Sequence, residues 1–171
     1  MTSKNTDLVL RSLRPDEDFV YLTQLLRRAY QIWADQGLRF QATHQPPEKT
    51  KDRCAEGHTI IAELSGKVIG LVTVNDPKNS AGVHWYEQPG VTSFHQFAVD
   101  PDFQKKGIGS ILLKECENQA RSLGLRELAL DTSEHAEALI QYYLRKGFRK
   151  VDEHRWNSAN YKSVVLSKTL V

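Results

Sequence analysis

Apolar side chains recur along this chain with two different periods. Over residues 16–30 they return every three or four positions, which predicts an amphipathic helix. The runs 58–64 and 67–75 are rich in β-branched residues and are joined by a Ser-Gly pair, which predicts a β-hairpin. The first half of the chain therefore contains elements of both kinds.

The second half alternates strands with helices. Residues 91–99 are predicted as a strand that a glycine-containing turn connects to a helix over 108–123. The other predicted elements are strands at 8–14, 127–131, 148–151 and 162–167, helices at 48–56 and 136–146, and a turn-rich loop at 76–90. This order predicts an α/β fold, and without an internal repeat or linker we expect a single domain over residues 1–171.

Composition narrows the class of protein. The chain has 171 residues, 40% of them hydrophobic and 26% charged, which is ordinary for a globular domain and excludes disordered, collagen-like and membrane-spanning chains. The formal net charge is only +2, so we expect no broad basic surface for nucleic acid. A local site for an anion remains compatible with this balance.

Cysteine and histidine positions exclude further classes. The two cysteines, Cys54 and Cys116, lie too far apart in sequence for a disulfide framework, and the N-terminus lacks the apolar core of a leader peptide. We therefore expect a cytoplasmic protein that does not enter a membrane. The six histidines show no metal-ligand spacing, so we expect no metal.

The clearest chemical signal lies at residues 104–110, Gln-Lys-Lys-Gly-Ile-Gly-Ser. Glycines let backbone N–H groups approach a ligand at the start of a helix, and such groups bind anions. Lys105 and Lys106 add positive charge beside these donors. The segment therefore predicts a phosphate site.

Other interpretations of this segment are weaker. A P-loop needs four residues between its glycines, whereas Gly107 and Gly109 are separated by one. A dinucleotide fingerprint needs a third glycine where Leu112 stands. The plain alternative is a turn that begins a helix next to surface lysines.

Two segments resemble a known family. Residues 97–109, Phe-Ala-Val-Asp-Pro-Asp-Phe-Gln-Lys-Lys-Gly-Ile-Gly, are similar to the acyl-CoA-binding signature of the GNAT superfamily of N-acetyltransferases, in which Gln/Arg-x-x-Gly-x-Gly/Ala follows a strand. Residues 142–148 resemble the family's Tyr-x-x-x-Gly-Phe segment. The resemblance implies a GNAT fold, with a mixed, twisted central sheet that is splayed at its middle and flanked by helices.

The resemblance also implies acetyl-CoA as the acyl donor. Backbone groups of the strand that ends at Val99 would bind the pantetheine arm, and N–H groups of the glycine turn would bind the pyrophosphate. The cofactor-binding residues expected on this basis are Phe97, Ala98, Val99, Gln104, Lys105, Lys106, Gly107, Ile108, Gly109, Ser110 and Tyr143.

Acetyl transfer to an amine requires an acid, a donor to the carbonyl oxygen and a base. Tyr143 stands at the family's tyrosine position and is the expected acid, although a tyrosine on a helix also packs readily in a core. The backbone N–H of Phe97 is the expected donor to the carbonyl oxygen. His95, on the same face of a regular strand as Phe97, is the candidate base, with Glu87 acting through water as the alternative.

The acceptor substrate is the part of the reaction that the sequence constrains least. Trp33, Phe40, Trp85 and Glu87 are the expected substrate-binding residues, because the loops that carry them flank the acceptor pocket in the family. We expect a small-molecule amine or a peptide N-terminus as the partner, and a monomer or homodimer. The alternative to an enzyme is a non-catalytic acyl-CoA-binding sensor or docking module.

Overall fold

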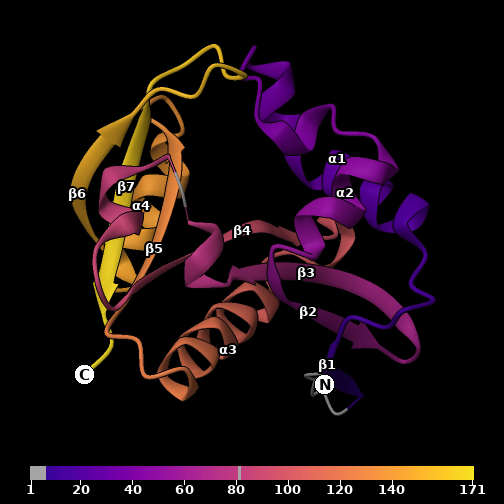
Figure 1. Cartoon of the computed structure of the whole chain (residues 1–171). Coiled ribbons are helices and arrows are strands. Elements are labelled where there is room, and N and C mark those ends of the chain that lie inside the picture. The colour runs from indigo at the N-terminus through magenta and orange to yellow at the C-terminus, as the bar shows by residue number, and fades with distance from the viewer. Residues whose placement is uncertain (1–6, 81) are drawn as a thin grey trace.

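The structure is a computed structural model that describes residues 7–80 and 82–171. Its centre is a seven-stranded sheet in the order β1-β2-β3-β4-β5-β7-β6 (Figure 1). The strands are β1 (Leu8–Ser12), β2 (Gly57–Leu64), β3 (Lys67–Asn75), β4 (Val91–Val99), β5 (Glu127–Ser133), β6 (Arg149–His154) and β7 (Ser163–Thr169). Neighbours are antiparallel except β4 and β5, so the sheet is mixed, as expected.

Four α-helices flank the sheet. They are α1 (Phe19–Asp35), α2 (Pro47–Cys54), α3 (Ile108–Ser122) and α4 (Glu137–Arg145). The first helix begins three residues later than its apolar pattern predicts, because Asp18 caps it by accepting a hydrogen bond from the Tyr21 N–H. The remaining predicted helices and strands agree with the structure to within a few residues at each end.

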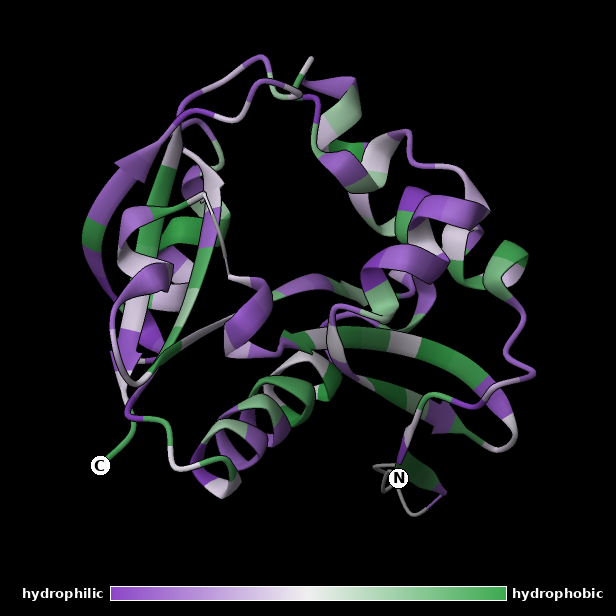
Figure 2. Cartoon of the chain, viewed as in Figure 1, coloured by the Kyte–Doolittle hydropathy of each residue, from purple (hydrophilic) through white to green (hydrophobic). Residues whose placement is uncertain are grey.

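The helices cover both faces of the sheet. On one face, apolar residues of α1 pack against β2, β3 and the end of β4; the members are Leu22, Leu25, Leu26, Ile61, Leu71 and Ala98. On the other face, α3 and α4 pack against the middle of the sheet, with Leu112, Cys116, Val72, Phe94, Leu128 and Tyr143 among the members. Figure 2 shows the resulting apolar band along β3 and α3.

The sheet opens between β4 and β5. These strands pair only from Val91 to Ser93, opposite Glu127 to Ala129, and diverge beyond that point. The sheet is therefore splayed at its middle, which confirms this part of the expected fold. The divergence leaves the second half of β4 without a partner on its β5 side.

Two distant segments meet across this opening (Figure 1). Asn160, between β6 and β7, accepts a hydrogen bond from the Arg39 N–H at 2.9 Å and donates one to the Gly37 carbonyl at 2.8 Å. We call this pair of contacts the Asn160 clasp. It joins the segment after α1 to the far half of the sheet.

No helix within residues 7–80 and 82–171 is long and apolar enough to cross a membrane. Residues 1–6, on which the expectation of no leader peptide rests, lie outside the described part of the chain.

Candidate active site

A bulge interrupts β4 where the sheet splays. Gln96 has a φ of 53°, and the pairing with β3 shifts there: His95 lies opposite Thr73, whereas Ala98 lies opposite Leu71. One extra residue in a strand places two successive side chains on the same side. A positive φ is uncommon for glutamine, so the rest of the structure must hold it in place.

The bulge changes which side chains share a face. Phe97 packs near Phe94 on the α3 side, with their ring centroids 5.9 Å apart. His95 instead contacts α2, with its Nε2 atom 3.2 Å from the Arg53 carbonyl oxygen. The prediction that His95 and Phe97 share a face is therefore wrong, because it assumed regular alternation through residues 91–99.

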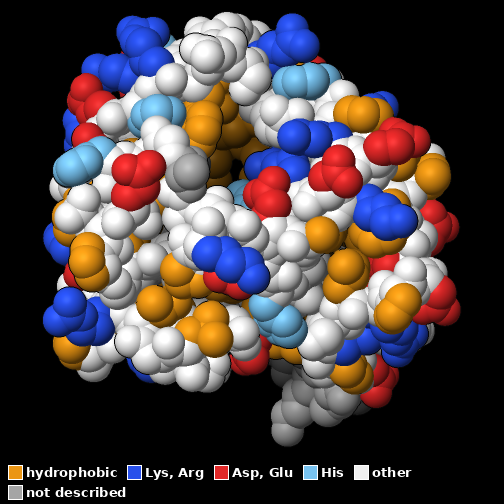
Figure 3. Space-filling view, viewed as in Figure 1, with side chains coloured by type: hydrophobic (Ala, Val, Ile, Leu, Met, Phe, Trp, Pro, Cys, Tyr) orange, Lys and Arg blue, Asp and Glu red, His pale blue; other side chains and the backbone are white. Residues whose placement is uncertain are grey.

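A cavity of about 790 Å³ occupies the opening of the sheet. This is a usual size for a small-molecule site. Figure 3 shows the hollow, with hydrophobic side chains inside it and Lys and Arg side chains near its rim. One end is lined by the glycine turn and the start of α3; we call the other the α2 end, which is lined by α1, α2 and residues 156–161.

The glycine turn presents unused donors. Gly107 has a φ of 83° and precedes the first residue of α3, and Lys105 also has a positive φ, 62°. The N–H groups of Ile108, Gly109 and Ser110 donate to no backbone carbonyl among the described residues. Backbone N–H groups at a helix start are suited to an anion, so the turn fits a phosphate group.

Most of the expected cofactor-binding residues line the cavity. They are Phe97, Ala98, Val99, Gln104, Lys105, Gly107, Gly109, Ser110 and Tyr143. The Ile108 side chain is buried in the core, and the Lys106 ammonium lies over the Phe103 ring at 5.4 Å. A Cβ atom at Gly109 would meet its nearest described neighbours at 3.6 Å or more, so the protein itself leaves room there.

Tyr143 and Tyr142 both reach the cavity. Tyr143 is 4% exposed and packs against Phe94 and Phe148, and burial raises the pKa of its phenol well above the ordinary value. Its hydroxyl forms no hydrogen bond with another described residue. Tyr142 packs partly against the same core and places its hydroxyl 3.4 Å from Ser110 Oγ at the glycine turn.

Tyr30 is a cavity residue that the sequence did not single out. Its hydroxyl donates a hydrogen bond of 3.0 Å to the Phe97 carbonyl, directly after the bulge. Burial raises the pKa of Tyr30 to about 12, so the phenol remains protonated. The contact fixes the orientation of the β4 backbone at the splay.

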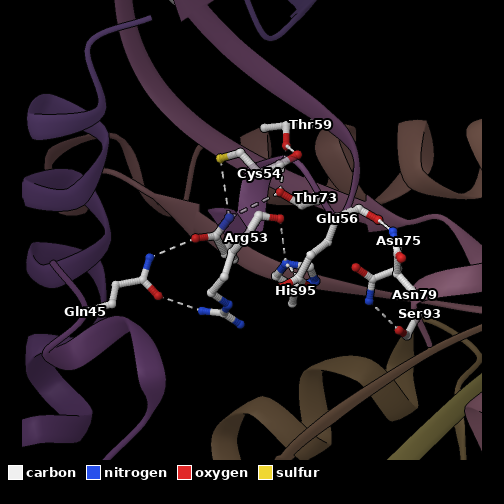
Figure 4. Close-up of polar contacts among 11 residues, drawn as sticks. Gln45, Arg53, Cys54, Glu56, Thr59, Thr73, Asn75, Asn79, Ser93 and His95 are labelled. Atoms are coloured by element: carbon white, nitrogen blue, oxygen red, sulfur yellow. Dashed lines mark hydrogen bonds and ion pairs between the residues drawn. The ribbon is translucent and has the colours of Figure 1, made fainter. Parts of the chain in front are cut away.

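Charged and polar side chains meet at the α2 end (Figure 4). His95 Nε2 lies 3.4 Å from Glu56 Oε2 as well as near the Arg53 carbonyl. Burial, with the nearby Arg53 charge, lowers the pKa of His95 to about 3, so the ring is neutral at neutral pH. Its contacts assign the proton to Nε2. Burial also raises the pKa of the Glu56 carboxyl, and Arg53 opposes that shift.

The buried side-chain amide of Gln45 positions the Arg53 side chain. Its Nη1 donates a hydrogen bond of 2.7 Å to Gln45 Oε1, and burial lowers the pKa of the guanidinium. Gln45 is fully buried and donates through Nε2 to Thr50 Oγ1 and Gln96 Oε1, each at 2.8 Å. The bulge residue therefore belongs to the same network as Arg53.

The expected substrate-binding residues divide into two groups. Trp33 and Phe40 line the α2 end, and their ring centroids are 6.2 Å apart. Trp85 and Glu87 do not line the cavity. Trp85 packs beside the β5–β7 core under Arg149, and Glu87 accepts a hydrogen bond from a backbone N–H in its own loop.

This difference has a physical cause. The loop over residues 76–90 packs on the sheet through Val83, and its short helical turn places Tyr86, not Trp85 or Glu87, at the cavity, where the Tyr86 hydroxyl donates a hydrogen bond to Asp131. The cavity residues missed by sequence reasoning are Tyr30, Arg39, Lys49, Arg53, Glu56 and Asp131. No motif marks them, because only the packing of α1 and α2 over the bulge brings them together.

Residues 19–148 match the model of the acetyltransferase (GNAT) family. The chain belongs to this family. The match covers more than half of the chain and includes both segments whose resemblance the sequence indicated. The expected GNAT fold and membership are thereby confirmed.

A curated relative supports an acetyltransferase activity. The chain is 32% identical over 146 residues to the S-(2-succino)cysteine N-acetyltransferase of Bacillus subtilis, covering 82% of this chain and 84% of that protein. This acetyltransferase is therefore an enzyme rather than a sensor without activity.

Solved structures agree on the fold. The ribosomal-protein-S18-alanine N-acetyltransferase of Escherichia coli aligns with a TM-score of 0.71 and 16% identity, covering 95% of this chain and 94% of that chain. A GNAT family acetyltransferase from Elizabethkingia anophelis, solved with acetyl-CoA bound, aligns with a TM-score of 0.68 and 17% identity, covering 96% and 99%. The glycine turn of the present chain offers the donors that such a ligand requires.

Proposed function

We propose that this acetyltransferase transfers the acetyl group of acetyl-CoA directly to the primary amine of a small molecule. The supporting observation is the single cavity that runs from the glycine turn, past Tyr143, to the α2 end. Both substrates fit in one such space at the same time, so the amine attacks the thioester in a ternary complex.

The cysteines give separate support for direct attack. A covalent acetyl-enzyme would need a reactive thiol or another nucleophile in the cavity. Cys54 and Cys116 are buried, burial raises the pKa of both thiols, and neither lines the cavity. No described cysteine is therefore placed to carry the acetyl group.

On the donor side, we propose that the backbone does most of the binding. The N–H groups of Ile108, Gly109 and Ser110 hold the diphosphate, and the open edge of β4 holds the pantetheine. The N–H of Phe97 polarises the acetyl carbonyl. Tyr30 supports this arrangement, since its bond to the Phe97 carbonyl keeps that peptide group in a fixed orientation.

Tyr143 is the proposed acid. Its hydroxyl has no protein partner among the described residues and lines the cavity, and its raised pKa keeps the phenol protonated until a stronger base forms beside it. A departing thiolate is such a base. The phenol donates its proton to the sulfur as the carbon–sulfur bond breaks.

Glu56 is the proposed base, in place of His95 and Glu87. With a pKa near 3, His95 binds a proton too weakly to take one from an ammonium group, and Glu87 lies outside the cavity. The Glu56 carboxylate lines the cavity and has a raised pKa. The neutral His95 acts as a positioning residue by donating its Nε2–H toward Glu56 and the Arg53 carbonyl.

The experiment that tests this function is thiol release from acetyl-CoA with a panel of small amines. The relative from Bacillus subtilis makes S-(2-succino)cysteine the first acceptor to try. Tyr143→Phe should lower kcat about 100-fold, because it removes a general acid while keeping the packed ring.

Tyr142→Phe is the matched control, because it removes a neighbouring hydroxyl that lies at the glycine turn. We expect it to keep kcat within a few-fold of the parent. Equal kcat values for Tyr143→Phe and the parent would show that Tyr143 is not the acid, and no thiol release with any amine would refute the function itself.

A further inference from the structure

The α2 end of the cavity carries more positive than negative charge. Arg39, Lys49 and Arg53 line it, and the carboxylates that line the cavity are Glu56 and Asp131. The charges on the cavity wall thus indicate an anionic group on the ligand.

Both carboxylates already have roles within the protein. Asp131 accepts hydrogen bonds from the Tyr86 hydroxyl at 2.7 Å and from Trp156 Nε1 at 2.8 Å, one on each oxygen. Glu56 lies beside His95, with 3.4 Å between Oε2 and Nε2. Neither forms an ion pair with a cation of the cavity within the described part of the chain.

Arg53 is a preorganised donor. Its one side-chain hydrogen bond goes to the neutral Gln45 oxygen, and among residues 7–80 and 82–171 it has no ion pair. Gln45 cannot rotate away without breaking its bonds to Thr50 and Gln96. Figure 4 shows Arg53 lying between Gln45 and His95. Most of its guanidinium N–H groups are therefore free to bind a planar anion through bidentate hydrogen bonds.

Two further cations reinforce this site. The side chains of Arg39 and Lys49 form no hydrogen bond or ion pair with other described residues, and both line the same cavity. Arg39 and Lys49 are exposed, so the cost of an unpaired charge out of water falls on the partly buried guanidinium of Arg53, which a bound anion would compensate. A carboxylate is the common organic anion with the matching geometry.

We propose that the acceptor is an amine that also carries a carboxylate, as an amino acid does, and that Arg53 binds that carboxylate. This inference rests on the proposed function and adds the class of the acceptor and the residue that selects it. Arg53 holds the carboxylate, and Glu56, three residues further along the chain, faces the same space and takes the proton of the amine.

The same arrangement disfavours other amines. A polyamine would bring several positive charges beside Arg39, Lys49 and Arg53 without pairing any of them. An amino acid amide keeps the amine and the shape of the acid but lacks its charge. Comparison of acids with their amides therefore isolates the contribution of the carboxylate.

The test measures kcat/KM of the full chain for L-amino acids, S-substituted cysteines included, for the corresponding amides, and for spermidine. We expect the acids to be preferred over their amides by about 30- to 100-fold, the usual value of a charged hydrogen-bonded pair. Measured well above the pH at which Glu56 is protonated, Arg53→Gln should reduce this preference to a few-fold by slowing the acids far more than the amides. Arg53→Lys should keep part of the preference for acids, because lysine retains the positive charge but cannot form the paired hydrogen bonds of a guanidinium.

Two variants serve as controls. Lys49→Gln alters an exposed residue, so it folds even if Arg53→Gln does not, and we expect a smaller loss of the preference. Arg121→Gln removes an exposed arginine of α3 that does not line the cavity, and we expect no change. Equal rates for acids and amides in the parent, or an unchanged preference in Arg53→Gln, would overturn the proposal.

A binding measurement separates this inference from the proposed function. Succinate, a dicarboxylate without an amine, should raise the unfolding temperature of the parent but not of Arg53→Gln. If no amine is acetylated and succinate still stabilises only chains that retain Arg53, the function fails and the anion site stands. If succinate does not stabilise the parent, the anion site fails.

Discussion

Gln96 shows how the backbone of one residue decides the chemistry of the site. Its positive φ moves His95 to the α2 side and leaves Phe97 on the α3 side. The side chain also donates toward Cys54 Sγ at 3.4 Å and Thr73 Oγ1 at 3.3 Å. These contacts hold a conformation that few glutamines adopt.

Glu56 leads to a prediction about pH at the scale of a residue. Because burial raises the pKa of this carboxyl, it is protonated, and unable to accept a proton, at pH values above those expected for an ordinary glutamate. We expect kcat to fall as the pH drops through this raised value. Glu56→Gln should lower kcat at every pH and remove this acidic limb from the profile.

The control for this prediction is Glu48→Gln, which alters an exposed carboxylate on α2 that does not line the cavity. Arg53→Gln adds an independent check. It removes the charge that opposes the shift at Glu56, so the acidic limb should move to higher pH. An acidic limb that persists in Glu56→Gln would assign the base to another group.

Local signatures made part of the site predictable. The glycine turn and Tyr143 belong to short segments whose residues are close in sequence, and both reach the cavity. Tyr30 and Arg53 come from α1 and α2, and Glu56 from the turn after α2, and the docking of these segments depends on contacts with β4 that no periodic pattern encodes. The error over His95 has the same origin, since the sequence does not reveal a bulge.

At the scale of elements, strands and helices with regular apolar spacing were predicted well, whereas the side chains by which the loop over residues 76–90 reaches the cavity were not. β3 and β4 agree with the sequence prediction at both ends. The family resemblance placed this loop beside the acceptor, and Asn79, Ser80 and Tyr86 do line the cavity, whereas the expected Trp85 and Glu87 do not. Composition alone does not state which surface an aromatic side chain covers.

The first turn of α3 carries a prediction about acetyl-CoA. Gly109→Val should raise the KM for acetyl-CoA at least 10-fold, because its side chain would project toward the cavity beside Phe97 and Tyr142. The fold should survive, since a Cβ atom there makes ordinary contacts. Gly109→Ala is the smaller control and should change KM only a few-fold. Unchanged KM in the valine variant would place the diphosphate elsewhere.

At the scale of the whole molecule, two connections across the splayed sheet flank the cavity. One is the short pairing of β4 with β5, and the other is the Asn160 clasp. An aromatic contact lies beside the clasp, where the ring centroids of Phe40 and Tyr161 are 5.1 Å apart. The cavity lies between these two connections.

Asn160→Ala should loosen the α2 end without affecting the glycine turn. Loss of two hydrogen bonds frees the segment after α1, so we expect the KM for the acceptor to rise about 5-fold while the KM for acetyl-CoA stays the same. Asn157→Ala, an exposed asparagine of the same loop, is the control. A matching rise in both KM values would mean that the clasp supports the whole cavity.

The Asn160 clasp also constrains the order of events in a catalytic cycle. Because the cavity lies between the clasp and the β4–β5 pairing, one space serves both substrates of the proposed direct transfer, and both must be bound before the acetyl group moves. Initial rates measured against both substrates should therefore give intersecting rather than parallel double-reciprocal lines. Parallel lines would instead mean that coenzyme A leaves before the amine binds, with the acetyl group held by the protein between the two steps.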